Sequence, residues 1–263
     1  MIHPTAIIHP KAKLEASVRV GPFAVIDEGV ELGPGCVVGP HVYLTGQTRI
    51  GAENRFHAGC VIGDAPQDLK YRDEPTRLRI GDGNVFREGV TVHRSTKMDG
   101  ETVVGSNNYL MANSHVGHNC IVGDQVILAN GAMLGGYAEA QDRAFISGNC
   151  LVHQFCRVGT LAMMQGSSAV SRDLPPFCTA LEVNLICGLN VVGLRRANFP
   201  PAERMELKKL YRFLFRSGRN LREAVAAARK DFCSAPAGIL LEFVANAKRG
   251  VCADVGGATS ETE

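Results

Sequence analysis

Tryptophan is absent from this 263-residue chain, and aromatic residues make up only 6% of it. Together with the lack of any known nucleic-acid-binding motif, this argues against a nucleic-acid partner. No stretch of about 18 consecutive apolar residues occurs, so we expect no transmembrane segment. The opening sequence MIHPTAIIHP has neither a basic region nor the long apolar core of a secretory signal, and we therefore expect a cytoplasmic protein.

The nine cysteines are scattered and form no CxxC pair. This spacing excludes the common zinc motifs and favours reduced thiols over a disulfide framework. Nothing in the sequence calls for a resident metal or a cofactor, and we expect neither.

Apolar residues instead recur at every sixth position. Counting by six from Ile2 to Val170 gives 29 positions, of which only Asp68 and Glu74 are polar, in a chain that is 45% hydrophobic. The residue four places further on is usually small, and glycine often follows directly. A period of six fits neither a helix nor a simple strand. It fits a short strand and a sharp turn, repeated, which predicts a mainly β fold, a parallel β-helix.

The pattern also divides the chain. We expect a β-helix over residues 1–175 with an inserted loop at 68–79, a linker at 176–199, an α-helical C-terminal subdomain at 200–250 and a flexible tail at 251–263. The subdomain is predicted by apolar residues at helical spacing after Pro200 and Pro201. Residues 195–250 carry 13 Lys/Arg and 5 Asp/Glu, which suits either solvated helix faces or the docking of an acidic partner.

Such hexads resemble the hexapeptide-repeat transferases, whose three-faced coils imply 18 residues per turn. Residues 18 apart then stack at strand spacing. This brings together residues that are distant in the chain. They are His118, Gly136, Tyr137, His153 and Gln154, with His115 nearby.

The predicted cluster has the chemistry of a base and an oxyanion site. Imidazole is the best side-chain base near neutral pH, and the glycines expose backbone N–H groups. Two other interpretations stay open. His118 could be an ordinary solvated histidine, or His93, His115 and His118 could hold zinc between chains, as in the gamma-class carbonic anhydrases. Those enzymes lack a helical C-terminal subdomain of this kind.

Longer motifs resemble one family closely, the UDP-N-acetylglucosamine O-acyltransferases that begin lipid A synthesis. The motifs are PQDLKYRDEPTR, VTVHRST, HVGHNC, VHQFCRVG, RDLPPF and GLNVVGLRR. The resemblance implies a left-handed β-helix and a homotrimer with sites between subunits. It also implies transfer of a 3-hydroxyacyl chain from acyl carrier protein, an acidic partner, to the 3-hydroxyl of a UDP-sugar.

By this resemblance His118 is the general base and the Gly136 N–H the oxyanion donor, with Asn119 orienting the base. Gly166 and Met163 lie at the acyl-ruler position, which limits chain length. The remaining matches are substrate contacts: Asp68, Lys70, His115, Tyr137, His153, Gln154, Asn190 and Arg196.

The chain departs from the family pattern at three positions. Many members have Asp where this chain has Asn119, His where it has Tyr137, and an acidic residue where it has Val192. An amino-sugar acceptor, which needs less help from a base, would fit these changes. Two alternatives therefore remain beside the O-acyltransferase: an N-acyltransferase of the same fold and a non-catalytic homologue. The N-acyltransferase of the following lipid A steps usually carries an extra N-terminal domain, whereas here Ile2 already opens the hexads.

Overall fold

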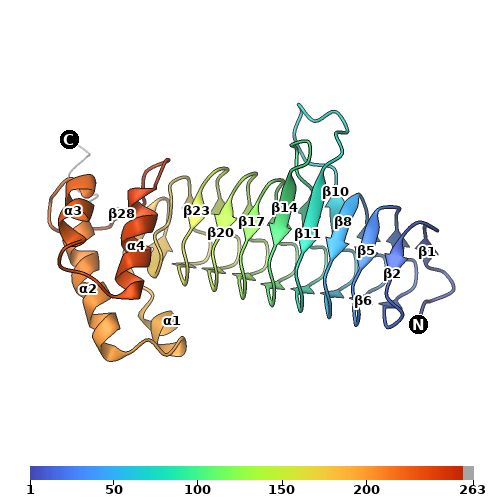
Figure 1. Cartoon of the computed structure of the whole chain (residues 1–263), viewed down its shortest axis with the longest axis horizontal. Helices are drawn as coiled ribbons and strands as arrows, with labels where there is room; N and C mark the ends of the chain where they lie inside the picture. The colour runs from blue at the N-terminus through green and yellow to red at the C-terminus, as the bar shows by residue number, and fades with distance from the viewer. Residues whose placement is uncertain (257–263) are drawn as a thin grey trace.

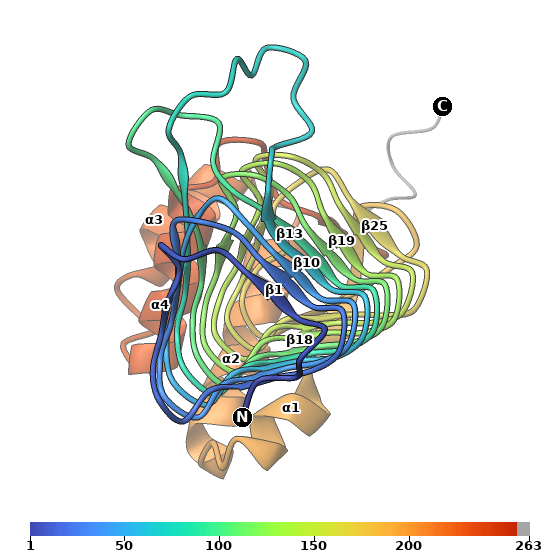
Figure 2. The same ribbon diagram turned by 90° about the vertical axis from the view of Figure 1, so that its right-hand side faces the viewer.

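The computed structural model describes residues 1–256, which form a triangular parallel β-helix ending in a helical subdomain (Figures 1 and 2). We name its three sheets A, B and C, and the chain visits them in the order A, B, C in each coil. Sheet B contains β1 Ile7–Ile8, β4 Val25–Ile26, β7 Tyr43–Leu44, β10 Val61–Asp64, β13 Thr91–His93, β16 His115–Val116, β19 Met133–Leu134, β22 Leu151–Val152 and β25 Ala169–Val170.

Sheets A and C complete the coil. Sheet C contains β2 Lys13–Leu14, β5 Val30–Leu32, β8 Gln47–Ile50, β11 Arg77–Ile80, β14 Glu101–Val104, β17 Ile121–Val122, β20 Glu139–Ala140 and β23 Arg157–Val158. Sheet A contains β3 Arg19–Val20, β6 Val37–Val38, β9 Arg55–Phe56, β12 Val85–Phe86, β15 Tyr109–Leu110, β18 Ile127–Leu128, β21 Phe145–Ile146, β24 Met163–Met164, β26 Cys178–Leu181, β27 Leu185–Leu189 and β28 Ala253–Asp254.

The expected register is confirmed along most of the β-helix. Ile7 pairs with Val25, one coil of 18 residues later, and the second residue of each two-residue strand points inward. The small residues at the corners fill the narrow parts of the core, as predicted. Five of them are the fully buried cysteines Cys36, Cys60, Cys120, Cys150 and Cys156, and all nine cysteines are free.

Two loops, not one, interrupt the register. Val61 pairs with Thr91 and Thr91 with His115, so these coils take 30 and 24 residues instead of 18. The extra residues of the first of these coils contain the predicted loop at 68–79. The second, at 94–100, was not predicted, because Met98 keeps the six-residue period although its side chain is 67% exposed. Both loops project from the same side of the coil (Figure 2).

The segment expected as a linker is structured. The strands β26 and β27 form an antiparallel hairpin, and α1 Val191–Arg196 follows directly. The helical subdomain then contains α2 Pro201–Phe215, α3 Leu221–Ala228 and α4 Ala235–Ala245, which pack around a second apolar core. No helix within residues 1–256 is long and apolar enough to cross a membrane.

The start of the expected tail is also ordered. In β28, Asp254 is buried and accepts hydrogen bonds from Tyr211 and Arg216, while the strand pairs with β27. A buried carboxylate with two donors holds the chain in place. The rest of the expected tail, 257–263, lies outside the described residues.

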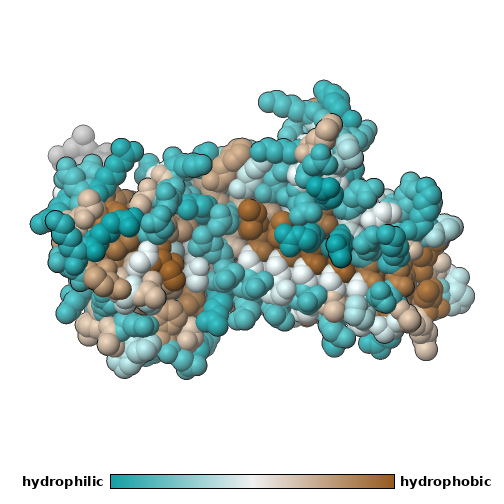
Figure 3. Space-filling view, viewed as in Figure 1, coloured by the Kyte–Doolittle hydropathy of each residue, from teal (hydrophilic) through white to brown (hydrophobic). Residues whose placement is uncertain are grey.

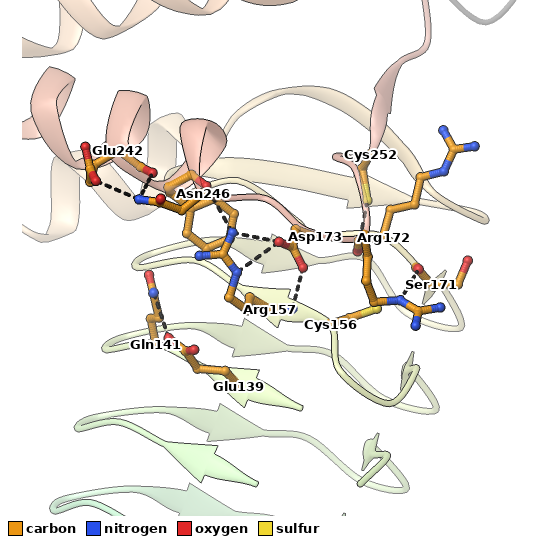
Figure 4. A network of polar contacts seen from close by, with 12 residues as sticks. Glu139, Gln141, Cys156, Arg157, Ser171, Arg172, Asp173, Glu242, Asn246 and Cys252 are labelled. Carbon is orange, nitrogen blue, oxygen red and sulfur yellow. Dashed lines mark hydrogen bonds and ion pairs between the residues drawn. The ribbon is translucent and has the colours of Figure 1, made fainter. Parts of the chain in front are cut away.

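A buried ion pair at the end of the β-helix also contacts the helical subdomain (Figure 4). Arg157 on β23 contacts Asp173 through Nε at 2.9 Å and Nη2 at 2.7 Å, and Asp173 is only 2% exposed. The same guanidinium donates to the Phe243 carbonyl on α4 at 3.0 Å and lies 4.0 Å from the Phe243 ring centroid. Arg157 therefore couples the last coils to α4.

We predict that Asp173→Ala lowers the free energy of unfolding by about 3 kcal/mol, since it leaves the Arg157 charge unpaired beside the core. Chemical denaturation followed by circular dichroism measures this loss. The control is Lys13→Ala, which breaks the exposed pair with Glu31 and should change stability little. Equal effects of the two substitutions would contradict the coupling role.

Candidate active site

A cleft of about 1080 Å³ lies where sheet B turns toward sheet C. Its floor is the outer face of sheet B, with Met133 and Leu151, and the loop at 68–79 overhangs it. Figure 3 shows the projecting loops as largely hydrophilic. Eight of the predicted site residues line this one cleft: Asp68, Lys70, His115, His118, Gly136, Tyr137, His153 and Gln154.

The stacked corners bring these residues together as predicted. The Tyr137 N–H donates to the His118 carbonyl at 2.9 Å, and the Phe155 N–H donates to the Gly136 carbonyl at 3.1 Å. Asn119 takes a left-handed backbone conformation at its corner, with φ of 60°, which asparagine adopts more readily than most residues. The corner geometry thus sets the direction of the side chains at 118 and 119.

Glycine is required at position 136 by the imidazole beside it. A Cβ placed on Gly136 would lie 2.5 Å from both Cε1 and Nε2 of His118. The ring therefore rests directly against this backbone. The Gly136 N–H donates to no acceptor among residues 1–256, which leaves it available to a ligand.

Asn119 holds the other side of the His118 ring. Its Oδ1 lies 2.9 Å from His118 Nδ1, and the Tyr137 ring meets the imidazole edge-on at 5.4 Å between centroids. The predicted orienting contact of Asn119 is therefore present. The two neighbours fix the plane of the ring and leave Nε2 toward Gly136.

A corner separates His115 from His118, because His115 lies on β16 and His118 follows in the turn. His115 Nδ1 is 2.7 Å from Thr91 Oγ1, and its ring meets that of His93 at 4.9 Å. Burial, followed by the effects of His93 and His118, lowers the pKa of His115 to about 4. Burial likewise lowers the pKa of His93. Both rings are therefore neutral near pH 7.

The zinc interpretation places the metal between chains, and the described part of one chain alone does not supply a complete set of ligands. Among residues 1–256, no three His, Cys, Asp or Glu side chains converge in an arrangement that could hold a metal ion.

Arg94 anchors the loop that carries Asp68 and Lys70, a role that was not predicted. Its Nη1 donates to the Gly63 carbonyl at 2.9 Å, its Nε donates to the Tyr71 hydroxyl at 3.2 Å, and its guanidinium lies over the Tyr71 ring. The loop is thus tied down at its centre. No signal in the sequence locates this second loop, because the apolar period of six runs through it unbroken from Val92 to Val116.

The remaining predicted residues lie elsewhere. Met163, Asn190 and Arg196 line a second cavity of about 730 Å³, on the outer face of sheet A beside α1, which shares no lining residue with the first. Asn190 caps α1 by accepting from the Gly193 N–H at 2.9 Å. Gly166 lines neither cavity and sits at the exposed corner between sheets A and B, with only the Gly148 carbonyl within 4 Å of a would-be Cβ. The sequence-predicted site is therefore split between two faces of one chain.

Because the folded chain keeps His115 neutral down to about pH 4 while the unfolded chain protonates it near pH 6.5, stability should fall as pH drops through this range. We predict that His115→Asn reduces this loss by about 2 kcal/mol. Urea denaturation at pH 7 and pH 4.5 measures it, with exposed His153→Asn as the control. An unchanged pH dependence in His115→Asn would contradict the effect of burial.

Comparison with known proteins agrees with the motifs. The family model for UDP N-acetylglucosamine O-acyltransferase, domain 2, matches residues 173–252, and hexapeptide repeats match 11–46 and 101–136. An acyl-[acyl-carrier-protein]–UDP-N-acetylglucosamine O-acyltransferase of Syntrophobacter fumaroxidans is 46% identical over 95% of this chain and 98% of its own. One from Janthinobacterium is 43% identical over the same shares.

Solved structures agree as well. A UDP-N-acetylglucosamine acyltransferase of Francisella novicida has a TM-score of 0.93 at 34% identity and covers 99% of this chain and 96% of its own. The structure from Bacteroides fragilis has a TM-score of 0.90 at 36% identity, over 95% and 99%. The expected fold class, a left-handed parallel β-helix with a C-terminal helical part, is confirmed. The chain belongs to the family of acyl-[acyl-carrier-protein]–UDP-N-acetylglucosamine O-acyltransferases.

Proposed function

We propose that this protein transfers an (R)-3-hydroxyacyl chain from acyl carrier protein to the 3-hydroxyl of UDP-N-acetylglucosamine, the first step of lipid A biosynthesis. The observation that carries the proposal is the pairing of His118 with Gly136. A histidine oriented by Asn119 places Nε2 beside Gly136, whose backbone N–H has no partner of its own among the described residues. A base beside an oxyanion donor is what acyl transfer requires.

In the proposed reaction, His118 Nε2 takes the proton of the sugar hydroxyl as its oxygen attacks the thioester carbonyl. The new C–O bond forms while the carbonyl oxygen becomes an oxyanion, which the Gly136 N–H stabilises. Collapse of this intermediate breaks the C–S bond. The imidazolium then returns its proton to the departing thiolate, so that the base is restored.

The other residues of the cleft would bind the sugar nucleotide. Lys70 on the overhanging loop is exposed and suits a phosphate, while Asp68 suits a sugar hydroxyl. His115, Tyr137, His153 and Gln154 supply further polar atoms along the same cleft. From the second cavity, Asn190 and Arg196 would hold the uridine and its phosphates. Met163 in that cavity and Gly166 at the corner outside it would limit the length of the acyl chain.

The split site fits a homotrimer in which the second cavity of one subunit faces the first cavity of its neighbour. The outer face of sheet C carries charged pairs such as Lys13–Glu31 and Arg79–Glu101, as a solvent-facing surface does. The outer faces of sheets A and B are largely apolar, which supports their burial against other copies. The apolar outward residues include Val37, Val85, Tyr109, Ile127, Phe145 and Met163 on sheet A and Val25, Tyr43, Val61, Met133 and Leu151 on sheet B. The polar outward residues include Arg19 and Arg55 on sheet A and Thr91 and His115 on sheet B.

Acyl carrier protein, as an acidic partner, would dock on the helical subdomain. A groove of about 430 Å³ between β27, α1 and α2 gathers cationic side chains without an acidic one. Arg216 is paired with Asp254, and the other four cations suit an anionic protein surface and would steer association. These four are Arg195, Arg204, Lys208 and Arg212. The nine free cysteines support a reducing, cytoplasmic location.

A 3-amino sugar is a second candidate acceptor, favoured by the neutral Asn119 beside the base. An amide cannot stabilise an imidazolium with a full charge, and an amine nucleophile needs less help from a base. Assays of the purified protein with UDP-N-acetylglucosamine and its 3-amino analogue separate the two. Faster turnover of the 3-hydroxyl sugar would exclude the amino-sugar candidate.

We predict that His118→Ala lowers kcat at least a hundredfold, since it removes the base. Gly136→Ala should cause a similar loss because its methyl group displaces the imidazole. Transfer of a radiolabelled acyl chain from acyl carrier protein to the UDP-sugar measures both. Ser114→Ala, a buried serine whose hydroxyl has no partner among the described residues, is the control and should retain activity. Unchanged transfer by His118→Ala would refute this mechanism.

A further inference from the structure

Position 119 poses a problem of orientation. A carboxylate presents an oxygen to the imidazole whichever way it turns, whereas an amide has one oxygen and one NH₂ group. If the NH₂ group of Asn119 faced His118, it would donate to Nδ1 and leave the ring proton on Nε2. His118 could then not act as a base. Other residues of the chain must therefore fix the orientation of the Asn119 amide.

Two neighbouring residues of the second loop contact the Asn119 side chain. The Thr96 backbone N–H donates to Asn119 Oδ1 at 3.0 Å, and the Thr96 hydroxyl donates to the same oxygen at 2.8 Å. The Asn119 Nδ2 group donates to the Ser95 hydroxyl oxygen. Ser95 is fully buried, and its hydroxyl oxygen also accepts from the Lys97 N–H at 3.1 Å. These contacts allow only one orientation of the amide, since turning it over would set its NH₂ against the Thr96 N–H.

The positions of the protons follow from these contacts. Because Asn119 Oδ1 is an acceptor, the facing His118 Nδ1 carries the proton and Nε2 is free. Because the Thr96 hydroxyl donates to Asn119, it accepts from the Tyr137 hydroxyl, 3.0 Å away. The Asn119 backbone is held too, since its N–H donates to the buried Thr102 hydroxyl at 2.7 Å. The polar groups named here thus have uncharged hydrogen-bond partners, and the charge of Lys97 Nζ lies beside the ring of Tyr137, 5.2 Å from its centroid.

We propose that Ser95 and Thr96 are positioning residues of the acyl transfer, which set the Asn119 amide and thereby keep the proton of His118 on Nδ1. The inference rests on the proposed role of His118 as the base. It adds that the loop at 94–100 has a role in catalysis. Its residues Ser95 and Thr96 orient the Asn119 amide, so that the amide can stand in for a carboxylate beside His118. Tyr137 is a positioning residue as well, because its hydroxyl donates to the Thr96 hydroxyl and so ends this chain of hydrogen bonds.

The test is a double-mutant cycle between positions 95 and 119. Ser95→Ala leaves the Asn119 NH₂ group without its buried acceptor. The amide then no longer holds its orientation, and His118 Nδ1 loses its hydrogen bond to Asn119 Oδ1. We expect kcat to fall about tenfold, with KM for the UDP-sugar changed less than twofold. In an Asn119→Asp background no donor needs Ser95, so the same substitution should change kcat less than twofold.

Thr96 is tested in the same way. Thr96→Val, which removes the hydroxyl and keeps the shape, should lower kcat, and Thr96→Ser should restore it. Ser114→Ala serves as the matched buried-serine control. Equal losses from Ser95→Ala in both backgrounds, a change in KM instead of kcat, or an inactive Asn119→Asp enzyme would overturn the proposal. Activity retained by His118→Ala would instead refute the proposed base itself.

Discussion

The structure depends on the hydrogen bonds that stack each coil on the coil before it in register. Within an uninterrupted part of the β-helix, each residue stacks on the residue 18 places earlier. Side chains at the same corner of successive coils therefore form a column. Asn119, Tyr137 and Phe155 occupy one such column, and their φ angles of 60°, 61° and 64° show how closely the corner repeats. The His118 ring and the Gly136 backbone meet because of this repetition, without any flexible loop to bring them together.

The same rigidity separates the two parts of the proposed site. A triangular prism turns each sheet outward in a different direction, and no movement of one coil brings the sheet A cavity to the sheet B cleft. A site that needs both cavities must therefore be completed by another copy of the chain. The apolar outer faces of sheets A and B, beside the charged face of sheet C, agree with this requirement.

Much of the fold could be predicted from the sequence, because the period of six follows directly from burial of the inward residues. The patch around His118 could be predicted too, since stacking by 18 needs only an uninterrupted register. The loop at 94–100 could not, because Met98 preserves the period by chance while its side chain faces solvent. Ser95 and Thr96 were missed for that reason: their contacts with Asn119 cross the break in the register. The order of the segment around Asp254 depends on partners in α2, which no local pattern reveals.

The central claim is that each site combines His118 of one subunit with Arg196 of another. Refolding an equal mixture of His118→Ala and Arg196→Ala chains tests it most directly, since each variant alone should be nearly inactive. In a mixed homotrimer, the account predicts recovery of roughly one quarter of wild-type activity, the share of interfaces that unite two intact halves. A mixture no more active than its inactive components would contradict a site shared between subunits.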